Sequence, residues 1–188
     1  HEHFLCGGDT CNAVGHDDEG GDKVTFEPWN GSVTSGKYYL TGDLNGLTVP
    51  SGVNLTLCLN GHDTSSSYDG PTIEVKPGAT LTLCDCKSSG YITHARNVHG
   101  AGVFVGQKDD TVESNGQNSA VFHMYGGTIG GNSDTESGYD YTFGSGVVVM
   151  GGTFHMYGGK IANNRVDAST YNGSYGGGVS VYNNGTFN

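Results

Sequence analysis

The chain has 188 residues, of which 34 are glycine and only 4 are proline, so it is long enough for one ordinary domain and is neither collagen-like nor a proline-rich linker. Eight lysines and arginines stand against nineteen aspartates and glutamates, and the net charge of −11 argues against a nucleic acid or an anionic membrane surface as partner. The glycines separate short runs of Val, Ile, Thr, Tyr and Phe that lack helical periodicity and are too short to span a membrane, a pattern typical of an all-β fold.

The first element along the chain is a segment rich in cysteine and histidine, HEHFLCGGDTCNAVGH at 1–16. Nitrogen and sulfur ligands of this kind suit a tetrahedral zinc ion, and zinc would suit a segment with little apolar core of its own. The metal ligands that we predict are His3, Cys6, Cys11 and His16. Two alternatives remain open: a short disulfide between Cys6 and Cys11, or histidines that are simply solvated.

We predict that residues 1–45 form an N-terminal cap that carries this cluster, because they do not follow the repeat found in the rest of the chain. The exposed edge of a sheet has to be covered in a soluble protein. The segment 25–44 contains Trp29, Tyr38 and Tyr39, aromatic side chains that could cover such an edge, and we expect it to form the cap and the first coil. The repeats then occupy 46–188.

From residue 46 onward the sequence repeats itself in short units. LTVPSGVNLTLCLN (47–60) aligns without gaps to IEVKPGATLTLCDC (73–86), and FHMYGG occurs at 122–127 and again at 154–159. Each unit contains three short strand-like pieces, and repeats of this length indicate stacked units that bury their apolar faces against one another. Hairpin turns are not placed at every junction, which favours a parallel β-helix. GTFN at the end starts the same strand again, so we expect a chain truncated within a repeat.

Alternation along each strand-like piece predicts which side chains face the interior. We expect the inward side to be filled by Leu47, Val49, Leu55, Leu57, Ile73, Val75, Leu81, Leu83, Val103, Val105, Phe122, Met124, Val147, Val149, Phe154, Met156, Val179 and Val181. Phe104 and Val148 are expected to point outward. The polar insertions 107–118 and 133–141 are expected to be loops.

The outward side of the FHMYGG strands carries rings in register. Exposed rings in a row could stack on sugar faces, and imidazole nitrogens could hydrogen-bond to hydroxyl groups. Aromatic ladders also stabilise stacked strands without any ligand, so a purely structural role is the alternative. The candidate ligand-binding residues are His123, Tyr125, His155 and Tyr157.

The five cysteines cannot all pair with one another. Cys58 and Cys84 are expected on neighbouring units within disulfide range, but both side chains point the same way, which favours free thiols. Cys86 has no partner in any of these disulfide pairings, and only a metal site would use it. The carboxylates lie mostly in loops and do not recur in register beside a base, so we predict no catalytic residues and no enzyme.

The motifs TLCLNGH (56–62), TLTLCDC (80–86), GGTFHMYGG (151–159) and HxHxxCGG (1–8) together resemble right-handed β-helix modules of large surface proteins from Gram-positive gut bacteria. The resemblance covers nearly the whole chain. It implies a secreted or cell-wall-attached adhesin-like module, monomeric within a longer chain, whose partner is a host glycoprotein, a mucin or another glycan. The alternative is a structural spacer, and a polysaccharide lyase or hydrolase is a third reading that no residue supports.

Overall fold

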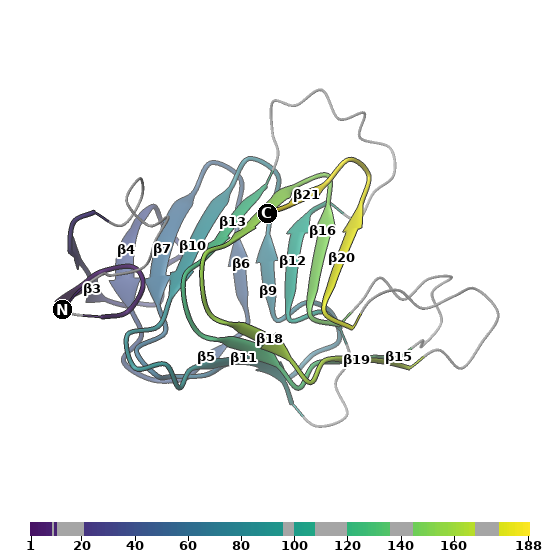
Figure 1. Cartoon of the computed structure of the whole chain (residues 1–188), viewed down its shortest axis with the longest axis horizontal. Helices are drawn as coiled ribbons and strands as arrows, with labels where there is room; N and C mark the ends of the chain where they lie inside the picture. The colour runs from purple at the N-terminus through teal and green to yellow at the C-terminus, as the bar shows by residue number, and fades with distance from the viewer. Residues whose placement is uncertain (9, 11–20, 96–99, 108–119, 136–144, 168–176) are drawn as a thin grey trace.

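A computed structural model describes residues 1–8, 10, 21–95, 100–107, 120–135, 145–167 and 177–188 (Figure 1). Every regular element in these residues is a β-strand, which confirms the all-β prediction. Within the same part of the chain, no helix is long and apolar enough to cross a membrane.

Three parallel sheets make up most of the described structure. The seven-stranded sheet has the order β21-β17-β13-β10-β7-β4-β3. Its strands, in chain order, are β3 (Glu27–Pro28), β4 (Gly36–Tyr39), β7 (Asn54–Cys58), β10 (Thr80–Cys84), β13 (Val121–Met124), β17 (Thr153–Met156) and β21 (Thr186–Phe187).

The other two parallel sheets have five strands each. One contains β5 (Leu44–Asn45), β8 (Thr64–Ser66), β11 (Tyr91–His94), β14 (Thr128–Gly130) and β18 (Lys160–Ala162). The other contains β6 (Leu47–Val49), β9 (Ile73–Val75), β12 (Val103–Gly106), β16 (Val147–Met150) and β20 (Val179–Tyr182). Two small sheets pair β1 (Glu2–His3) with β2 (Val24–Thr25) antiparallel and β15 (Ser133–Thr135) with β19 (Arg165–Asp167) parallel.

From β4 onward, consecutive strands along the chain belong to different sheets, and the chain returns to each parallel sheet in turn. Thus β6, β7 and β8 contribute one strand to each parallel sheet, and β9, β10 and β11 do so again. We call each such trio of strands a pass. The predicted alignment of 47–60 with 73–86 is confirmed by the register, because Leu55 pairs with Leu81 and Cys58 pairs with Cys84. Figure 1 shows the strands of successive passes lying side by side.

The inward residues predicted from the alternation form one apolar core. Most of them, including Leu55, Leu81 and Phe122, have no exposed surface. The exceptions lie in the last passes, where Met156 and Val179 are only half-buried and Val181 is 43% exposed. The prediction for the core is therefore confirmed except at Val181.

One expectation for the remaining elements needs correction. Ser133–Thr135 is predicted within a loop, but it forms β15, which pairs with β19. On the outward side of the β6–β20 sheet, Phe104 and Val148 lie apart from the core as predicted and are buried with Met150 in a separate apolar cluster. A parallel sheet with apolar side chains on both faces is usually buried on both faces by other parts of the protein. The strands β3, β4 and β5 lie within the predicted cap and join the parallel sheets, as expected for a first coil.

Candidate functional site

Four side chains from distant parts of the sequence meet beside the seven-stranded sheet. They are His1, His3, Cys58 and Cys86, which we call the Cys/His cluster, and their ligand atoms all lie within 4.8 Å of one another. The Cys86 sulfur is 3.3 Å from Nε2 of His1 and 3.5 Å from the Cys58 sulfur. The distance from the Cys58 sulfur to Nε2 of His1 is 4.0 Å.

The parallel register brings the two cysteines of this cluster together. Cys58 is the last residue of β7, and Cys84, its register partner, is the last residue of β10. Cys86 follows two residues later. The Cys84 sulfur is directed at the carbonyl oxygen of Leu57 at 3.7 Å and does not belong to the cluster. Cys58, Cys84 and Cys86 are free thiols.

The two histidines reach the cysteines because the N-terminal segment lies over the outward side of the sheet. Strand β1 pairs with β2, and the backbone N–H of Phe26 donates to the carbonyl of His1 at 2.8 Å. Leu5 and Phe26 are both buried in one apolar cluster with Cys58, Cys84 and Tyr125. Burial of these apolar side chains stabilises the segment in this position.

Each histidine ring is held by an aromatic neighbour. His3 stacks on Phe26 with ring centroids 4.6 Å apart, and His1 stacks on Tyr39 at 4.5 Å. His3 is only 3% exposed. Its Nδ1 lies 2.5 Å from the carbonyl oxygen of Phe4, whereas its Nε2 is buried without a hydrogen-bond partner. A carbonyl oxygen can only accept, so Nδ1 carries the hydrogen and Nε2 presents a lone pair when the ring is neutral.

The neighbouring groups change one another's ionisation. The pKa of Cys58 is lowered to about 4, chiefly by the adjacent Cys84 side chain and also by His3, while burial acts in the opposite direction. Burial raises the pKa of Cys86 to about 12, assisted by the charge on Cys58, and raises the pKa of Cys84 well above its usual value. Burial lowers the pKa of His3, but the Cys58 sulfur and the Phe4 carbonyl outweigh it and leave that pKa raised. Cys58 raises the pKa of His3 through the proximity of its charge, because Nε2 of His3 has no hydrogen-bond partner.

The turn that carries Cys86 is fixed by the buried carboxylate of Asp85, which is 2% exposed. Its Oδ1 accepts from the backbone N–H of Gly61 at 2.7 Å, and its Oδ2 accepts from the N–H of Gly90 at 2.7 Å. The N-terminal segment also touches this turn, because a side chain on Gly7 would place its Cβ 2.8 Å from the Asp85 carbonyl oxygen. Asp85 therefore links the turn before β8, its own turn and the start of β11.

We expect Asp85→Ala to lower the free energy of unfolding by about 2–4 kcal/mol, because two buried amide donors lose a charged acceptor. Asp85→Asn retains the shape and one acceptor oxygen, so its loss should be about half as large. Equilibrium unfolding in urea, followed by circular dichroism, measures both. Equal stability of Asp85→Ala and the unchanged protein would show that the carboxylate does not hold the turn.

The sequence-based metal prediction overlaps this cluster at His3 alone. Cys6 is half-buried and lies outside the cluster, while Cys11 and His16 fall outside the described residues, so the four-residue site remains a prediction. Sequence reasoning did not select His1, Cys58 or Cys86 as ligands. The one indication in the sequence was Cys86, which has no partner in any disulfide scheme and is therefore available as a metal ligand.

The structure also places the four rings predicted to bind a ligand. His123 stacks on His155 with centroids 5.0 Å apart, and Tyr125 stacks on Tyr157 at 4.6 Å. We call this set the ring ladder. Tyr125 is only 3% exposed because it lies in the apolar cluster with Leu5, whereas the other three rings are half-buried. The predicted stacking is confirmed, and the accessible part of the ladder consists of His123, His155 and Tyr157.

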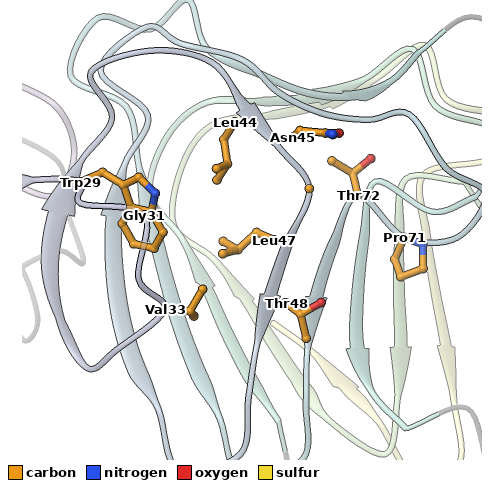
Figure 2. Close-up of a pocket in the computed structure, with 10 residues that line it drawn as sticks. Trp29, Gly31, Val33, Leu44, Asn45, Leu47, Thr48, Pro71 and Thr72 are labelled. Carbon is orange, nitrogen blue, oxygen red and sulfur yellow. The ribbon is translucent and has the colours of Figure 1, made fainter.

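An open pocket of about 440 Å³ lies elsewhere, near the first strands of the five-stranded sheets. Figure 2 shows Trp29, Leu44 and Leu47 around it, with Thr48 and Thr72 on another side. Among the described residues, the lining is apolar apart from Asn45, Thr48 and Thr72. The pocket can accommodate an apolar group.

No family model, curated protein or solved structure matches the chain. The Cys/His cluster and the ring ladder are the two arrangements whose chemistry points to a function. Two imidazoles and two thiols within a few ångströms can hold a metal ion such as zinc, which prefers nitrogen and sulfur ligands. The half-buried rings of the ladder can contact a flat or hydroxylated ligand.

Proposed function

We propose that this chain is a right-handed parallel β-helix module of a secreted or cell-wall-attached protein and that it binds a surface ligand without catalysis. The β-helix is supported by the three parallel sheets, each of which takes one strand from every pass. Connections between parallel strands of one sheet are right-handed in nearly all proteins, which supports that handedness. The module is proposed to act as a monomeric unit within a longer chain.

The observation that carries the binding proposal is the ring ladder on the outward side of β13 and β17. His155 and Tyr157 have nearly parallel rings 6.0 Å apart and are both half-buried, so each keeps part of its surface open to solvent. Aromatic rings supply apolar contact area at low entropic cost, and imidazole adds a hydrogen-bonding group. The proposed ligand is a glycoprotein, a mucin or another glycan, and the charge of −11 favours neutral over polyanionic sugars.

A structural spacer is the second candidate. Tyr125 is buried and the rings stack on one another, so packing alone accounts for part of the ladder. The proposal assigns the chain no reaction, no nucleic-acid partner and no insertion into a membrane. It includes a structural zinc ion for the N-terminal segment, which would hold that segment on the sheet.

The test is a screen of the purified chain against mucins, glycoproteins and an array of glycans. We expect a ligand whose affinity falls at least about 10-fold in the double variant His155→Ala/Tyr157→Ala, because central aromatic contacts each contribute more than about 1 kcal/mol. Tyr91→Ala is the matched control, since Tyr91 is 45% exposed and lies on β11 in another sheet. Circular dichroism establishes that each variant folds.

Two results would count against the binding function. Absence of any ligand in the screen would favour the spacer. A ligand whose affinity is the same for the double variant and for Tyr91→Ala would place the binding surface away from the ladder.

A further inference from the structure

We propose that His1, His3, Cys58 and Cys86 are the four ligands of one tetrahedral zinc ion, which fastens the N-terminal segment to two successive strands of the seven-stranded sheet. This assignment deepens the structural zinc ion of the proposed function and differs from the site predicted from sequence, with which it shares only His3. It does not depend on the ring ladder, so either proposal can fail without the other.

The distances among His1, Cys58 and Cys86 are close to those of a metal site, and all four ligand atoms lie within 4.8 Å of one another. Zinc binds thiolate sulfur at about 2.3 Å and imidazole nitrogen at about 2.0–2.1 Å, so neighbouring ligand atoms in a tetrahedron lie about 3.4–3.8 Å apart. The corresponding distances are 3.3 Å from Cys86 to His1, 3.5 Å between the two sulfurs and 4.0 Å from Cys58 to His1. Shifts of a few tenths of an ångström would bring these three atoms to ideal positions.

His3 gives independent evidence, because one of its nitrogens lacks a partner. Its Nδ1 donates to the Phe4 carbonyl, so the ligand atom left is Nε2, which is buried and makes no hydrogen bond. A buried polar atom without a partner costs roughly 1–3 kcal/mol, and a metal ion would satisfy it. Histidines that bind metals usually donate their other N–H to a carbonyl or carboxylate, as His3 does.

The ligand set also fits zinc in charge and in rigidity. Two thiolates neutralise a divalent cation, so the occupied site would place no net charge beside the apolar cluster of Leu5 and Phe26. Stacking on Tyr39 and Phe26 fixes both imidazole rings before the ion binds. Four protein ligands leave no open coordination position, which is typical of structural rather than catalytic zinc.

The ion would connect three segments that are far apart in sequence. His1 and His3 belong to the N-terminal segment, Cys58 ends β7, and Cys86 follows β10. Described contacts between the segment and the sheet otherwise consist largely of the apolar cluster around Leu5 and Phe26. Because the closed loops are long, a link at this point removes much conformational freedom from the unfolded chain.

The rival arrangement is a disulfide between Cys58 and Cys86, whose sulfurs are 3.5 Å apart. Oxidation would remove both thiolates from the ligand set and leave Nε2 of His3 without a partner. The two states are mutually exclusive, and they can be separated by mass and by metal content.

The test uses the full chain, reduced, stripped of metal with a chelator and titrated with Zn²⁺ against a chromophoric competitor. We expect one Zn²⁺ per chain and an increase in the melting temperature. Co²⁺ in place of Zn²⁺ should give the absorption of a tetrahedral ion with a sulfur-to-cobalt charge-transfer band. Cys58→Ser/Cys86→Ser and His3→Ala should each weaken Zn²⁺ binding by at least about 100-fold.

A matched variant locates the site. Cys6→Ser/Cys11→Ser removes the two thiols of the site predicted from sequence and should leave Zn²⁺ affinity unchanged, because Cys6 lies outside the Cys/His cluster. Alkylation of the unsubstituted chain, read by mass spectrometry, should show Cys58 and Cys86 protected by Zn²⁺, a result that does not depend on any variant folding.

Three outcomes would overturn the assignment. The first is a reduced chain that binds no Zn²⁺. The second is binding that survives Cys58→Ser/Cys86→Ser but is lost in Cys6→Ser/Cys11→Ser, which would establish the site predicted from sequence. The third is a chain isolated with a Cys58–Cys86 disulfide that takes up no Zn²⁺ after reduction.

Discussion

Replacing Phe122 with alanine is expected to lower the free energy of unfolding by about 3–5 kcal/mol, because it leaves a cavity in a core that cannot close around it. Phe122 has no exposed surface, and its ring stacks on Phe154 with centroids 4.8 Å apart. Its other register neighbour is Leu81. Backbone hydrogen bonds to β10 and β17 fix the strand on both sides, so the neighbouring side chains cannot move far into the space.

Two variants at the same strand calibrate this expectation. Phe122→Leu places a leucine in register with Leu81 and Leu55 of the earlier passes, so it should lower the free energy of unfolding by only about 1 kcal/mol. Val121→Ala lies on the outward, half-buried side of β13 and should cost about 1 kcal/mol or less. Urea unfolding of all three variants gives the comparison. A loss at Phe122→Ala no larger than that at Val121→Ala would mean that the interior is not close-packed at this pass.

Much of the architecture could be predicted because the sequence repeats. Alternation is a local property, so the pairs Leu55 with Leu57 and Phe122 with Met124 indicate the inward side without any knowledge of the neighbouring strand. Equal spacing of the repeats then predicts the register, and Cys58 does pair with Cys84. Units that follow the same pattern and cannot bury their own apolar faces have few other ways to pack.

The candidate site could not be predicted in the same way, because it depends on a segment outside the repeat. Alternation correctly places Tyr125 on the outward side, but it does not show that Leu5 and Phe26 pack over this side and bury the ring. The same packing brings His1 and His3 to Cys58 and Cys86, more than fifty residues away in sequence. Proximity within 1–16 favoured Cys6 and Cys11 as ligands, whereas the fold brings one thiol from the end of β7 and one from the turn after β10.

The second large effect is expected at Gly106, the last residue of β12. Its φ is +122°, a conformation that side chains with a Cβ rarely adopt, and a Cβ built there would lie 1.8 Å from the carbonyl oxygen of Met150. Met150 is its register neighbour on β16, so the clash is with the backbone of the next pass. We expect Gly106→Ala to lower the free energy of unfolding by about 3–5 kcal/mol, the sum of backbone strain and overpacking.

Gly52→Ala separates the two contributions to this loss. Gly52 also has a positive φ, +80°, but a Cβ there would meet no atom within 4 Å. Its substitution should therefore cost only the backbone strain, about 1–2 kcal/mol. Urea unfolding of both variants tests whether the passes approach as closely as the structure indicates. If the two losses are equal, the space between β12 and β16 accommodates a methyl group. If Gly106→Ala loses at least about 2 kcal/mol more, the backbone of β16 approaches Gly106 too closely to admit one.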